Sequence, residues 1–299
     1  MAALRGALVT GASSGIGRAV ALRLAEAGFV VAACGRSSSA LESAFASAAP
    51  AVRARVLLCG SAAYDLAAES GCAAVVAAAL DALRGAGASL ALLVNNAGGG
   101  TLGSTLGDTR AAAVFDATLA LDLRAPFVLT SVCAPLIASA WPDGSGAIIN
   151  VSSVCGQRPM VGLGAYCIAK AGVEMLTKQT ALEFAGKLRC TCVAPATVVT
   201  DFHARAGMTK KFLHDRQRNQ LRRRPPAARA GVGAARRQQV ITKWRGRACA
   251  AAKRGAEGGA LMSAGTEWCA IEMRAGPPVR RASSTLTSPS GARACTPAP

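Results

Sequence analysis

Two side chains in the middle of the chain have types and a spacing that suit proton transfer. Tyr166 and Lys170 stand four residues apart in Tyr-Cys-Ile-Ala-Lys, and a helix would place them on one face. An ammonium near a phenol favours the phenolate, so we expect Lys170 to lower the pKa of Tyr166 from its ordinary value of about 10. The tyrosine would then serve as a general acid or base near neutral pH. An ordinary helix face has the same spacing.

A glycine-rich segment near the N-terminus has the pattern of a phosphate-binding turn. Thr-Gly-Ala-Ser-Ser-Gly-Ile-Gly begins at Thr10, between a short apolar segment and an amphipathic one. Gly11 permits a tight turn, while Gly15 and Gly17 let the backbone and the helix come close to a pyrophosphate. The N-terminus of that helix offers free N–H groups and the positive end of its dipole. The segment therefore predicts a dinucleotide site.

The elements that must position these residues follow from an alternation of apolar segments. Strands are predicted at 4–9, 29–34, 55–59, 90–94, 147–151 and 188–193, and helices at 15–27, 38–48, 66–84, 109–140 (in two parts) and 164–185. Short strands rich in valine and leucine, alternating with helices, indicate an α/β fold with a doubly wound, Rossmann-like parallel sheet. Right-handed crossovers place the ligand along the edge formed by the carboxyl ends of the strands.

The net charge of +18 is concentrated at the C-terminal end of the chain. Residues 1–208 hold 15 Lys/Arg and 12 Asp/Glu, whereas residues 209–299 hold 19 and 4. We therefore divide the chain into a dinucleotide-binding domain, 1–208, and a basic low-complexity tail, 209–299, that is expected to be largely disordered apart from a short helix at 232–244. The composition of the tail suits an out-of-frame or alternatively spliced segment as well as a genuine one.

The remaining composition excludes several classes of protein. Eleven cysteines and two histidines lack the spacing of a metal site or a disulfide framework, so we expect reduced thiols and no metal. No apolar run reaches the roughly 18 residues of a membrane span, and the N-terminal residues lead us to expect no secretory leader. We expect a cytoplasmic protein, with a mitochondrial location left open by three arginines and no acid in residues 1–25.

Taken together and in this order, the motifs resemble those of the short-chain dehydrogenase/reductase family, which includes 3-oxoacyl-ACP reductases and carbonyl reductases. The resemblance covers residues 4–207 and adds Asn-Asn-Ala-Gly at 95–98 and Ser153 to the glycine turn and the Tyr166/Lys170 pair. It implies interconversion of a carbonyl and a secondary alcohol, with hydride supplied by a nicotinamide. Ser153 would hydrogen-bond the substrate oxygen, Tyr166 would protonate it, and Lys170 would also hold the nicotinamide ribose.

The end of the second predicted strand bears on the choice of cofactor. Cys-Gly-Arg at 34–36 offers no carboxylate to repel a 2′-phosphate, and Arg36 can pair with one. We therefore predict NADP(H), with an unengaged loop arginine as the alternative. The resemblance adds Asp65 and Leu66 at the adenine, although Asp65 could instead be a helix N-cap, and it places Thr200 at the nicotinamide amide. The predicted cofactor-binding residues are Gly11, Ser13, Ser14, Gly15, Ile16, Gly17, Arg36, Asp65, Leu66, Asn95, Ala97, Gly98, Tyr166, Lys170, Pro195, Val198 and Thr200.

The sequence departs from the family pattern at two places. Asp122 stands where the family usually has an asparagine that supports a water relay to the lysine. Aspartate lacks the amide donor and adds a charge beside Lys170, so we place it with the catalytic residues and expect weakened turnover. After Met208 the family's further core helix and seventh strand are not recognisable, so we expect the sixth strand to lie at an open edge.

Three interpretations follow from these observations. The first is an NADP(H)-dependent oxidoreductase acting on a small carbonyl or alcohol, and the second is a non-catalytic NADP(H)-binding remnant without the C-terminal core. The third is a polyanion binder that acts through the basic tail, although that tail contains no recognisable nucleic-acid module. The sequence does not specify the substrate or the preferred direction. Family members assemble through their fourth and fifth helices, so a homo-oligomer is expected.

Overall fold

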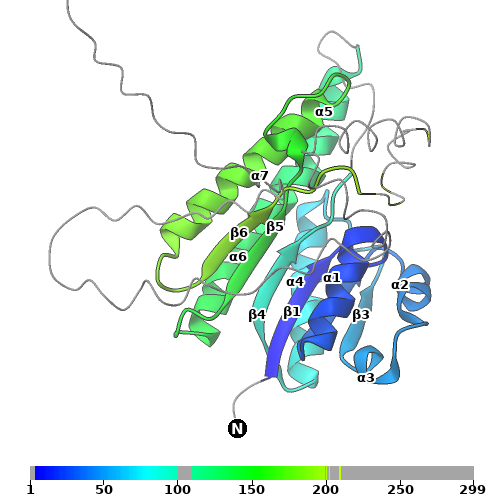
Figure 1. The fold of residues 1–299 in the computed structure, drawn as a ribbon, viewed down its shortest axis with the longest axis vertical. Coiled ribbons are helices and arrows are strands. Elements are labelled where there is room, and N and C mark those ends of the chain that lie inside the picture. Colours follow the sequence, from blue (N-terminus) through cyan, green and yellow to red (C-terminus); the bar gives the residue numbers. More distant parts are fainter. Residues whose placement is uncertain (1–3, 100–108, 199, 201, 203–208, 210–299) are drawn as a thin grey trace, which may run out of the picture.

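A six-stranded parallel sheet forms the centre of the molecule (Figure 1). The computed structural model describes residues 4–99, 109–198, 200, 202 and 209. The sheet order is β3-β2-β1-β4-β5-β6, and all neighbours are parallel. Its strands are β1 (Leu4–Thr10), β2 (Val30–Gly35), β3 (Val56–Gly60), β4 (Ala88–Asn95), β5 (Ala147–Val151) and β6 (Arg189–Val193). The doubly wound, Rossmann-like α/β fold predicted from the sequence is therefore confirmed.

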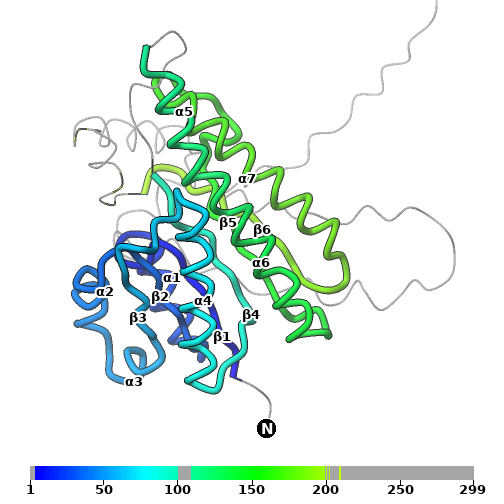
Figure 2. Tube along the Cα trace, turned by 180° about the vertical axis from the view of Figure 1, so that it is seen from behind, coloured from blue at the N-terminus to red at the C-terminus, as the bar shows by residue number. Residues whose placement is uncertain are grey.

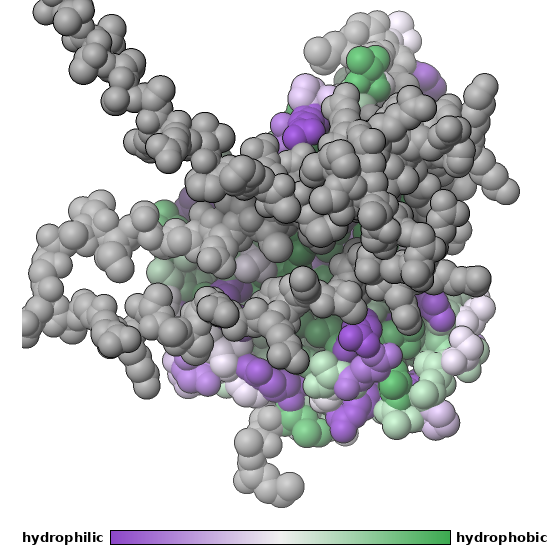
Figure 3. All heavy atoms as spheres, viewed as in Figure 1, coloured by the Kyte–Doolittle hydropathy of each residue, from purple (hydrophilic) through white to green (hydrophobic). Residues whose placement is uncertain are grey.

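Helices cover both faces of the sheet, as right-handed crossovers require. Helices α1 (Gly15–Glu26) and α2 (Ser38–Phe45) pack on one face, and α4 (Glu69–Gly85), α6 (Ala125–Ala140) and α7 (Gly164–Glu183) pack on the other (Figures 1 and 2). Figure 3, seen from the same side as Figure 1, shows hydrophilic and hydrophobic residues intermixed on the described surface around α1, α2 and α3 (Pro50–Arg53). The helices are α1 (Gly15–Glu26), α2 (Ser38–Phe45), α3 (Pro50–Arg53), α4 (Glu69–Gly85), α5 (Ala111–Leu119), η1 (Ala120–Arg124), α6 (Ala125–Ala140), η2 (Val154–Gly156) and α7 (Gly164–Glu183).

The two cores lie on opposite faces of the sheet because side chains alternate along each strand. Leu8 of β1 is paired with Leu93 of β4, and both belong to the core beneath α4 and α6. The next pair, Val9 and Val94, belongs to the core beneath α1 and α2. All four side chains are buried. This double-sided burial explains why the strands read as continuous apolar runs.

The long predicted helix at 109–140 is interrupted by a short π-helical segment, η1. Pro126 lies in the first turn of α6, as expected for a proline just inside the second part. The π-helical geometry itself was not predicted, because i→i+5 bonding leaves no pattern in residue type. It places Asp122 in the interior, where the side chain is buried. Such segments often occur at functional sites.

One helical stretch, Ala111–Ala140, is long and apolar enough to cross a membrane by length and composition alone. In the structure, however, Leu129, Cys133 and Ile137 of α6 are part of the core against the sheet, which accounts for much of that apolar character. The outer side of α6 and the neighbouring α7 still carry exposed apolar residues. These are Phe127, Val132 and Leu136 of α6, and Ile168, Met175 and Leu182 of α7.

Within the described part of the chain, β6 is an edge strand of the sheet, as the sequence predicted. Its outward-facing Arg189 and Thr191 are exposed, whereas Cys190 and Cys192 are buried on the side of α7. The predicted tail lies outside the described residues except for Thr209, and the predicted helix at 232–244 lies wholly outside them. The proposed division at residue 208 therefore stays a prediction.

Candidate active site

The turn after β1 and the turn after β4 meet where the strand order reverses direction, which is where open α/β sheets bind ligands. The Thr10 hydroxyl accepts hydrogen bonds from the backbone N–H groups of Asn96 and Ala97, both at 3.0 Å. The Asn96 side-chain amide donates to the Thr10 carbonyl at 2.8 Å and to the Gly11 carbonyl at 3.3 Å. These bonds tie the two turns together at the floor of the site.

The glycine turn has little room for side chains at this junction. Gly11 and Gly15 have φ values of +64° and +54°, in the left-handed region that favours glycine. A Cβ on Gly17 would lie 2.3 Å from the Gly11 carbonyl oxygen and 2.4 Å from the Asn96 side-chain nitrogen. Helix α1 begins directly after the turn, with no acidic residue in its first turn. The turn can therefore present backbone N–H groups to an anion.

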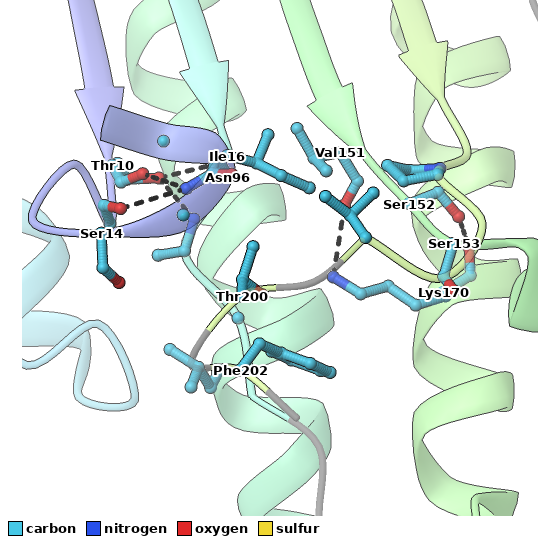
Figure 4. Close-up of a pocket in the computed structure, with 18 of the residues that line it drawn as sticks. Thr10, Ser14, Ile16, Asn96, Val151, Ser152, Ser153, Lys170, Thr200 and Phe202 are labelled. Atoms are coloured by element: carbon cyan, nitrogen blue, oxygen red, sulfur yellow. Dashed lines mark hydrogen bonds between the residues drawn. The ribbon is translucent and has the colours of Figure 1, made fainter. Parts of the chain in front are cut away.

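A cavity of about 300 Å³ runs from this turn to the ends of β5 and α7 (Figure 4). Figure 4 shows Thr10, Ser14, Ile16 and Asn96 on one side, and Ser153 and Lys170 on the other. The structure brings almost all of the predicted cofactor-binding residues to its wall. These are Gly11, Ser13, Ser14, Gly15, Ile16, Gly17, Arg36, Asp65, Leu66, Ala97, Gly98, Tyr166, Lys170, Pro195, Val198 and Thr200.

Asn95 is the predicted cofactor-binding residue that the structure places elsewhere. It is the last residue of β4, and its side chain is buried in the core rather than at the cavity wall. Its amide donates to Asn150 Oδ1 at 2.8 Å and to Thr130 Oγ1 at 3.1 Å. The neighbouring Asn96 lines the cavity instead. Sequence reasoning missed Asn96 because two adjacent asparagines cannot be assigned to opposite sides without the exact end of the strand.

The alternative role considered for Asp65, the N-cap of the following helix, is wrong. Helix α4 begins at Glu69, and its N-cap position is Ala68. The Asp65 carboxylate instead accepts a hydrogen bond from the Ala67 N–H at 3.1 Å, in the turn that precedes the helix. Asp65 and Leu66 both line the cavity near Arg36.

Ser153 and Tyr166 meet at the carboxyl end of β5. Ser153 caps the short helix η2, and its hydroxyl accepts a hydrogen bond from Cys155 N–H at 3.2 Å. The same side chain also lowers the pKa of the Tyr166 phenol, which lies in the first turn of α7. The ring of Phe202 lies 5.9 Å from the Tyr166 ring, centroid to centroid. Phe202 also lines the cavity, and no motif in the sequence pointed to it.

The Lys170 ammonium is held by two oxygen atoms in the interior. Asp122 Oδ1 lies 3.0 Å from it, and the two side chains are only 5% and 1% exposed. The ammonium also donates to the Val151 carbonyl at 3.2 Å (Figure 4). The Gly99 N–H donates to both carboxylate oxygens of Asp122, at 3.3 and 3.1 Å. A Cβ on Gly98 would lie 2.5 Å from the same carboxylate, so this glycine makes room for the ion pair.

The electrostatics of the site correct one expectation. Burial raises the pKa of Tyr166 above its ordinary value; Lys170 lowers it, but the Asp122 carboxylate adds to the raising effect. The predicted lowering is therefore wrong, because desolvation and the carboxylate together outweigh the ammonium. Burial lowers the pKa of Lys170, but Asp122 and Tyr166 raise it more, so the net shift is upward and the lysine stays charged.

A second buried carboxyl group, that of Glu174 on α7, was missed by sequence reasoning. It contacts Ser152, the residue that precedes Ser153. The Ser152 hydroxyl donates to the Lys170 carbonyl at 3.0 Å and to Glu174 Oε1 at 3.2 Å. Glu174 is 7% exposed, and burial raises its pKa, although Ser152 and Gln157 act to lower it. A glutamate on a helix carries no sign in the sequence that it faces inward.

The fold and the site together define a protein class. A parallel sheet has a glycine turn at its reversal point, and a Ser–Tyr–Lys group lies at the end of β5, facing the same cavity. These features are those of a dinucleotide-binding fold with an acid–base site beside the ligand.

Comparison with known proteins identifies the family. Residues 5–211 match the profile described as short chain dehydrogenase, and the chain belongs to the short-chain dehydrogenase/reductase family of oxidoreductases. It is 34% identical over 232 residues to the sepiapterin reductase of Meriones unguiculatus, an alignment that covers 72% of this chain and 82% of that one. It is also 34% identical over 198 residues to the human L-xylulose reductase, covering 66% and 72%.

Solved structures show the same relationship. The 3-ketoacyl-(acyl-carrier-protein) reductase from Brucella melitensis, complexed with NADH, superposes with a TM-score of 0.60 at 28% identity. The match covers 70% of this chain and 81% of that one. A short-chain dehydrogenase/reductase from Caenorhabditis elegans with cofactor also gives a TM-score of 0.60 at 28% identity, covering 71% and 76%. The family resemblance inferred from the motifs is therefore confirmed.

The buried carboxyl group of Glu174 yields a prediction for stability. Its pKa is raised in the folded protein, so ionising it costs more in the folded than in the unfolded state, and its contribution to stability falls as the pH rises above the unfolded value of about 4.3. We expect Glu174→Gln to gain stability relative to the wild type between pH 4 and pH 7. Urea unfolding at several pH values measures the difference; one that does not change with pH would contradict the prediction. The exposed Glu183→Gln is the matched control.

Proposed function

We propose that this protein is an NADP(H)-dependent oxidoreductase that interconverts a carbonyl and a secondary alcohol on a small molecule. One observation carries the proposal: Ser153, Tyr166 and Lys170 converge on the same cavity as the glycine turn and Arg36. A nucleotide held along the turn would extend toward the Ser–Tyr pair. The family membership gives the reaction class, and the side chains of this chain supply the rest.

The residues present fit a nicotinamide dinucleotide. The glycine turn offers backbone N–H groups at the N-terminus of α1, and this suits a pyrophosphate. The missing side chain at Gly17 lets this turn pack closely against Asn96. Asp65 and Leu66 would hold the adenine end, and Thr200 and Lys170 the nicotinamide end. When bound, the nicotinamide supplies or accepts the hydride.

The side chains of the chain would handle the proton. Ser153 and Tyr166 both line the cavity, and together their hydroxyls would hold the oxygen of a substrate carbonyl. During reduction, Tyr166 would donate its phenolic proton to that oxygen as the carbonyl carbon gains hydride, and in oxidation it would take the proton back. Lys170 would stabilise the resulting phenolate, since its ammonium lies 5.4 Å from the centre of the tyrosine ring.

Arg36 supports a preference for NADP(H). It follows the end of β2, is exposed, and lines the same cavity as Asp65. A guanidinium can form paired hydrogen bonds with a 2′-phosphate, and the adjacent Cys34 and Gly35 bring no repelling carboxylate. The Brucella relative was solved with NADH, so the proposed preference for NADP(H) depends on the residues of this chain.

The residues on the substrate side of the cavity support the proposal of a small carbonyl compound as substrate. Met160, Leu163 and Phe202 line it and pack in one cluster with Tyr166, which gives the cavity an apolar wall beside the tyrosine. Two relatives are named as reductases of sepiapterin and of L-xylulose, both small molecules. We propose a substrate of that size, held by the hydroxyl pair at one end and by apolar contacts at the other.

A second candidate function is an NADP(H)-binding protein without turnover. Two observations favour it: β6 is an edge strand within the described sheet, and Lys170 is paired with Asp122 in the interior. The two candidates share cofactor binding and differ only in chemistry. The proposed polyanion-binding tail, apart from Thr209, lies outside the residues that the structure describes.

We also propose that the protein self-associates through α6 and α7. Their outer faces carry large exposed apolar side chains, among which Phe127 is 56%, Met175 59% and Leu182 65% exposed. Side chains of this size on adjacent helices are typical of protein interfaces. A two-fold axis along these helices would bury the same face on both copies.

Self-association is tested with charge substitutions. We expect the wild type to elute at a multiple of 30.0 kDa, and the double variant Phe127→Glu/Met175→Glu to shift toward the monomer, because buried unpaired charges oppose association. Light scattering during size-exclusion chromatography measures the mass. Val161→Glu, at a residue that is 94% exposed, is the control that keeps the wild-type mass. A monomeric wild type would refute the interface.

Cofactor preference is tested at Arg36. We expect Arg36→Ala to raise the Kd for NADPH by about tenfold, the loss of one charge-assisted pair, with little change for NADH, which lacks the 2′-phosphate. Isothermal titration calorimetry gives both constants. The exposed Arg84→Ala, which lies outside the cavity, is the control. An equal loss for the two nucleotides would contradict the assignment.

Turnover is tested at Tyr166. We expect Tyr166→Phe to reduce kcat for carbonyl reduction by roughly 10²- to 10⁴-fold, the usual contribution of a general acid, while the Kd for NADPH stays close to that of the wild type. The measurement is NADPH oxidation with a panel of small ketones, aldehydes and sugars. A wild type that binds NADPH but turns over none of the panel favours the second candidate. Unchanged turnover in the variant would remove Tyr166 from the mechanism.

A further inference from the structure

The site contains a complete buried ion pair within reach of the tyrosine. Asp122 comes from the π-helical segment η1, and Lys170 from α7, one helical turn after Tyr166. Their charged atoms lie 3.0 Å apart with almost no exposure to solvent. Water therefore screens neither charge, and the field of each acts on its neighbours at a low local dielectric.

The groups that face Tyr166 come from several elements. Lys170 lies on α7, the same helix as Tyr166. Asp122 lies on η1, Cys155 on η2, and Ser153 at the start of η2. Cys192 of β6 faces Lys170 rather than the phenol. Among these described groups, Asp122 is the carboxylate that acts on both members of the Tyr–Lys pair. The negative charge that would oppose ionisation of the phenol thus has one main source.

We propose that Asp122 is a positioning residue that neutralises Lys170 electrostatically and so raises the pH at which Tyr166 would lose its proton. This inference rests on the proton-donor role proposed for Tyr166. A charge-neutral pair attracts a phenolate much less than a lone ammonium does. The phenol therefore keeps its proton at a pH where a lysine without a counter-ion would already favour its release.

The surrounding contacts hold the Asp122 carboxylate and the Lys170 ammonium in place. Both carboxylate oxygens of Asp122 accept a hydrogen bond from Gly99 N–H, and the lysine ammonium has the Val151 carbonyl as a further fixed partner. Gly98 leaves space for the carboxylate where any side chain would meet it. The carboxylate is thus oriented from the backbone side and is directed at the ammonium.

The inference can be tested without cofactor or turnover, because the full chain holds only two tyrosines, Tyr64 and Tyr166. In a Tyr64→Phe background, the tyrosinate absorbance reports Tyr166 alone, and Tyr64→Phe/Tyr166→Phe gives the blank. The pH midpoint of this signal is compared with and without Asp122→Asn. Circular dichroism at each pH confirms that the protein stays folded.

We expect Asp122→Asn to lower the midpoint by about one pH unit, the size of shift that a neighbouring charge produces. Asp122→Ser, which also removes the charge but is smaller, should lower it in the same direction and serves if the asparagine variant does not fold. Glu174→Gln removes another buried carboxyl group from α7 that is not among the groups acting on Tyr166, and it should leave the midpoint in place. An unchanged or higher midpoint in folded Asp122→Asn, or an equal fall in Glu174→Gln, would overturn the proposal.

The result is separable from that of the proposed function. If the wild type turns over no carbonyl but the midpoint falls in both neutral variants, Asp122 has the proposed electrostatic role and the proposed reaction is wrong. If the wild type reduces carbonyls, the pH at which kcat falls on the alkaline side should be lower in Asp122→Asn than in the wild type. This pH should decrease together with the tyrosinate midpoint. An alkaline fall in kcat that stays at the same pH while turnover continues would also overturn the proposal.

Discussion

The contact between the turns after β1 and β4 is the constraint on which the site depends. The two turns approach so closely that the Gly17 Cα has no room for a side chain between the Gly11 carbonyl and the Asn96 amide. Hydrogen bonds from Asn96 and to Thr10 then fix their relative position. Because β5 is the next strand along, the same constraint sets how far Ser153 and α7 lie from the glycine turn. The spacing of the whole cavity follows from this one approach.

Most of the fold could be predicted because the local pattern of apolar and polar residues indicates each strand and helix. Buried parallel strands read as apolar runs, and helices read as longer amphipathic segments, so the predicted strands differ from the observed ones by a residue or two at their ends. The glycine turn and the Tyr166/Lys170 pair could also be found, because each is a short motif whose geometry is set within one or two elements. Their convergence followed from the parallel topology alone.

What the sequence could not supply was anything decided by packing between distant segments. Asn95 and Asn96 differ by one position, yet β4 sends one into the core and the other to the cavity. Phe202 reaches Tyr166 from beyond β6, and no spacing rule connects them. The pKa of Tyr166 was assigned the wrong direction because the lysine four residues away is visible in the sequence, whereas the burial and the facing carboxylate of Asp122 are not.

The π-helical segment that carries Asp122 makes the site sensitive to chain length as well as to residue type. It accommodates one residue more per turn than an α-helix does. Deletion of a single residue from Ala120–Arg124 would remove the extra residue, let α5 and α6 join as one regular helix of about 3.6 residues per turn, and turn the side chain at position 122 in a different direction. The carboxylate would then leave the lysine, although every side chain of the catalytic group remained. Among relatives, a one-residue gap at this point of the alignment would therefore mark a change in the electrostatics of the active site.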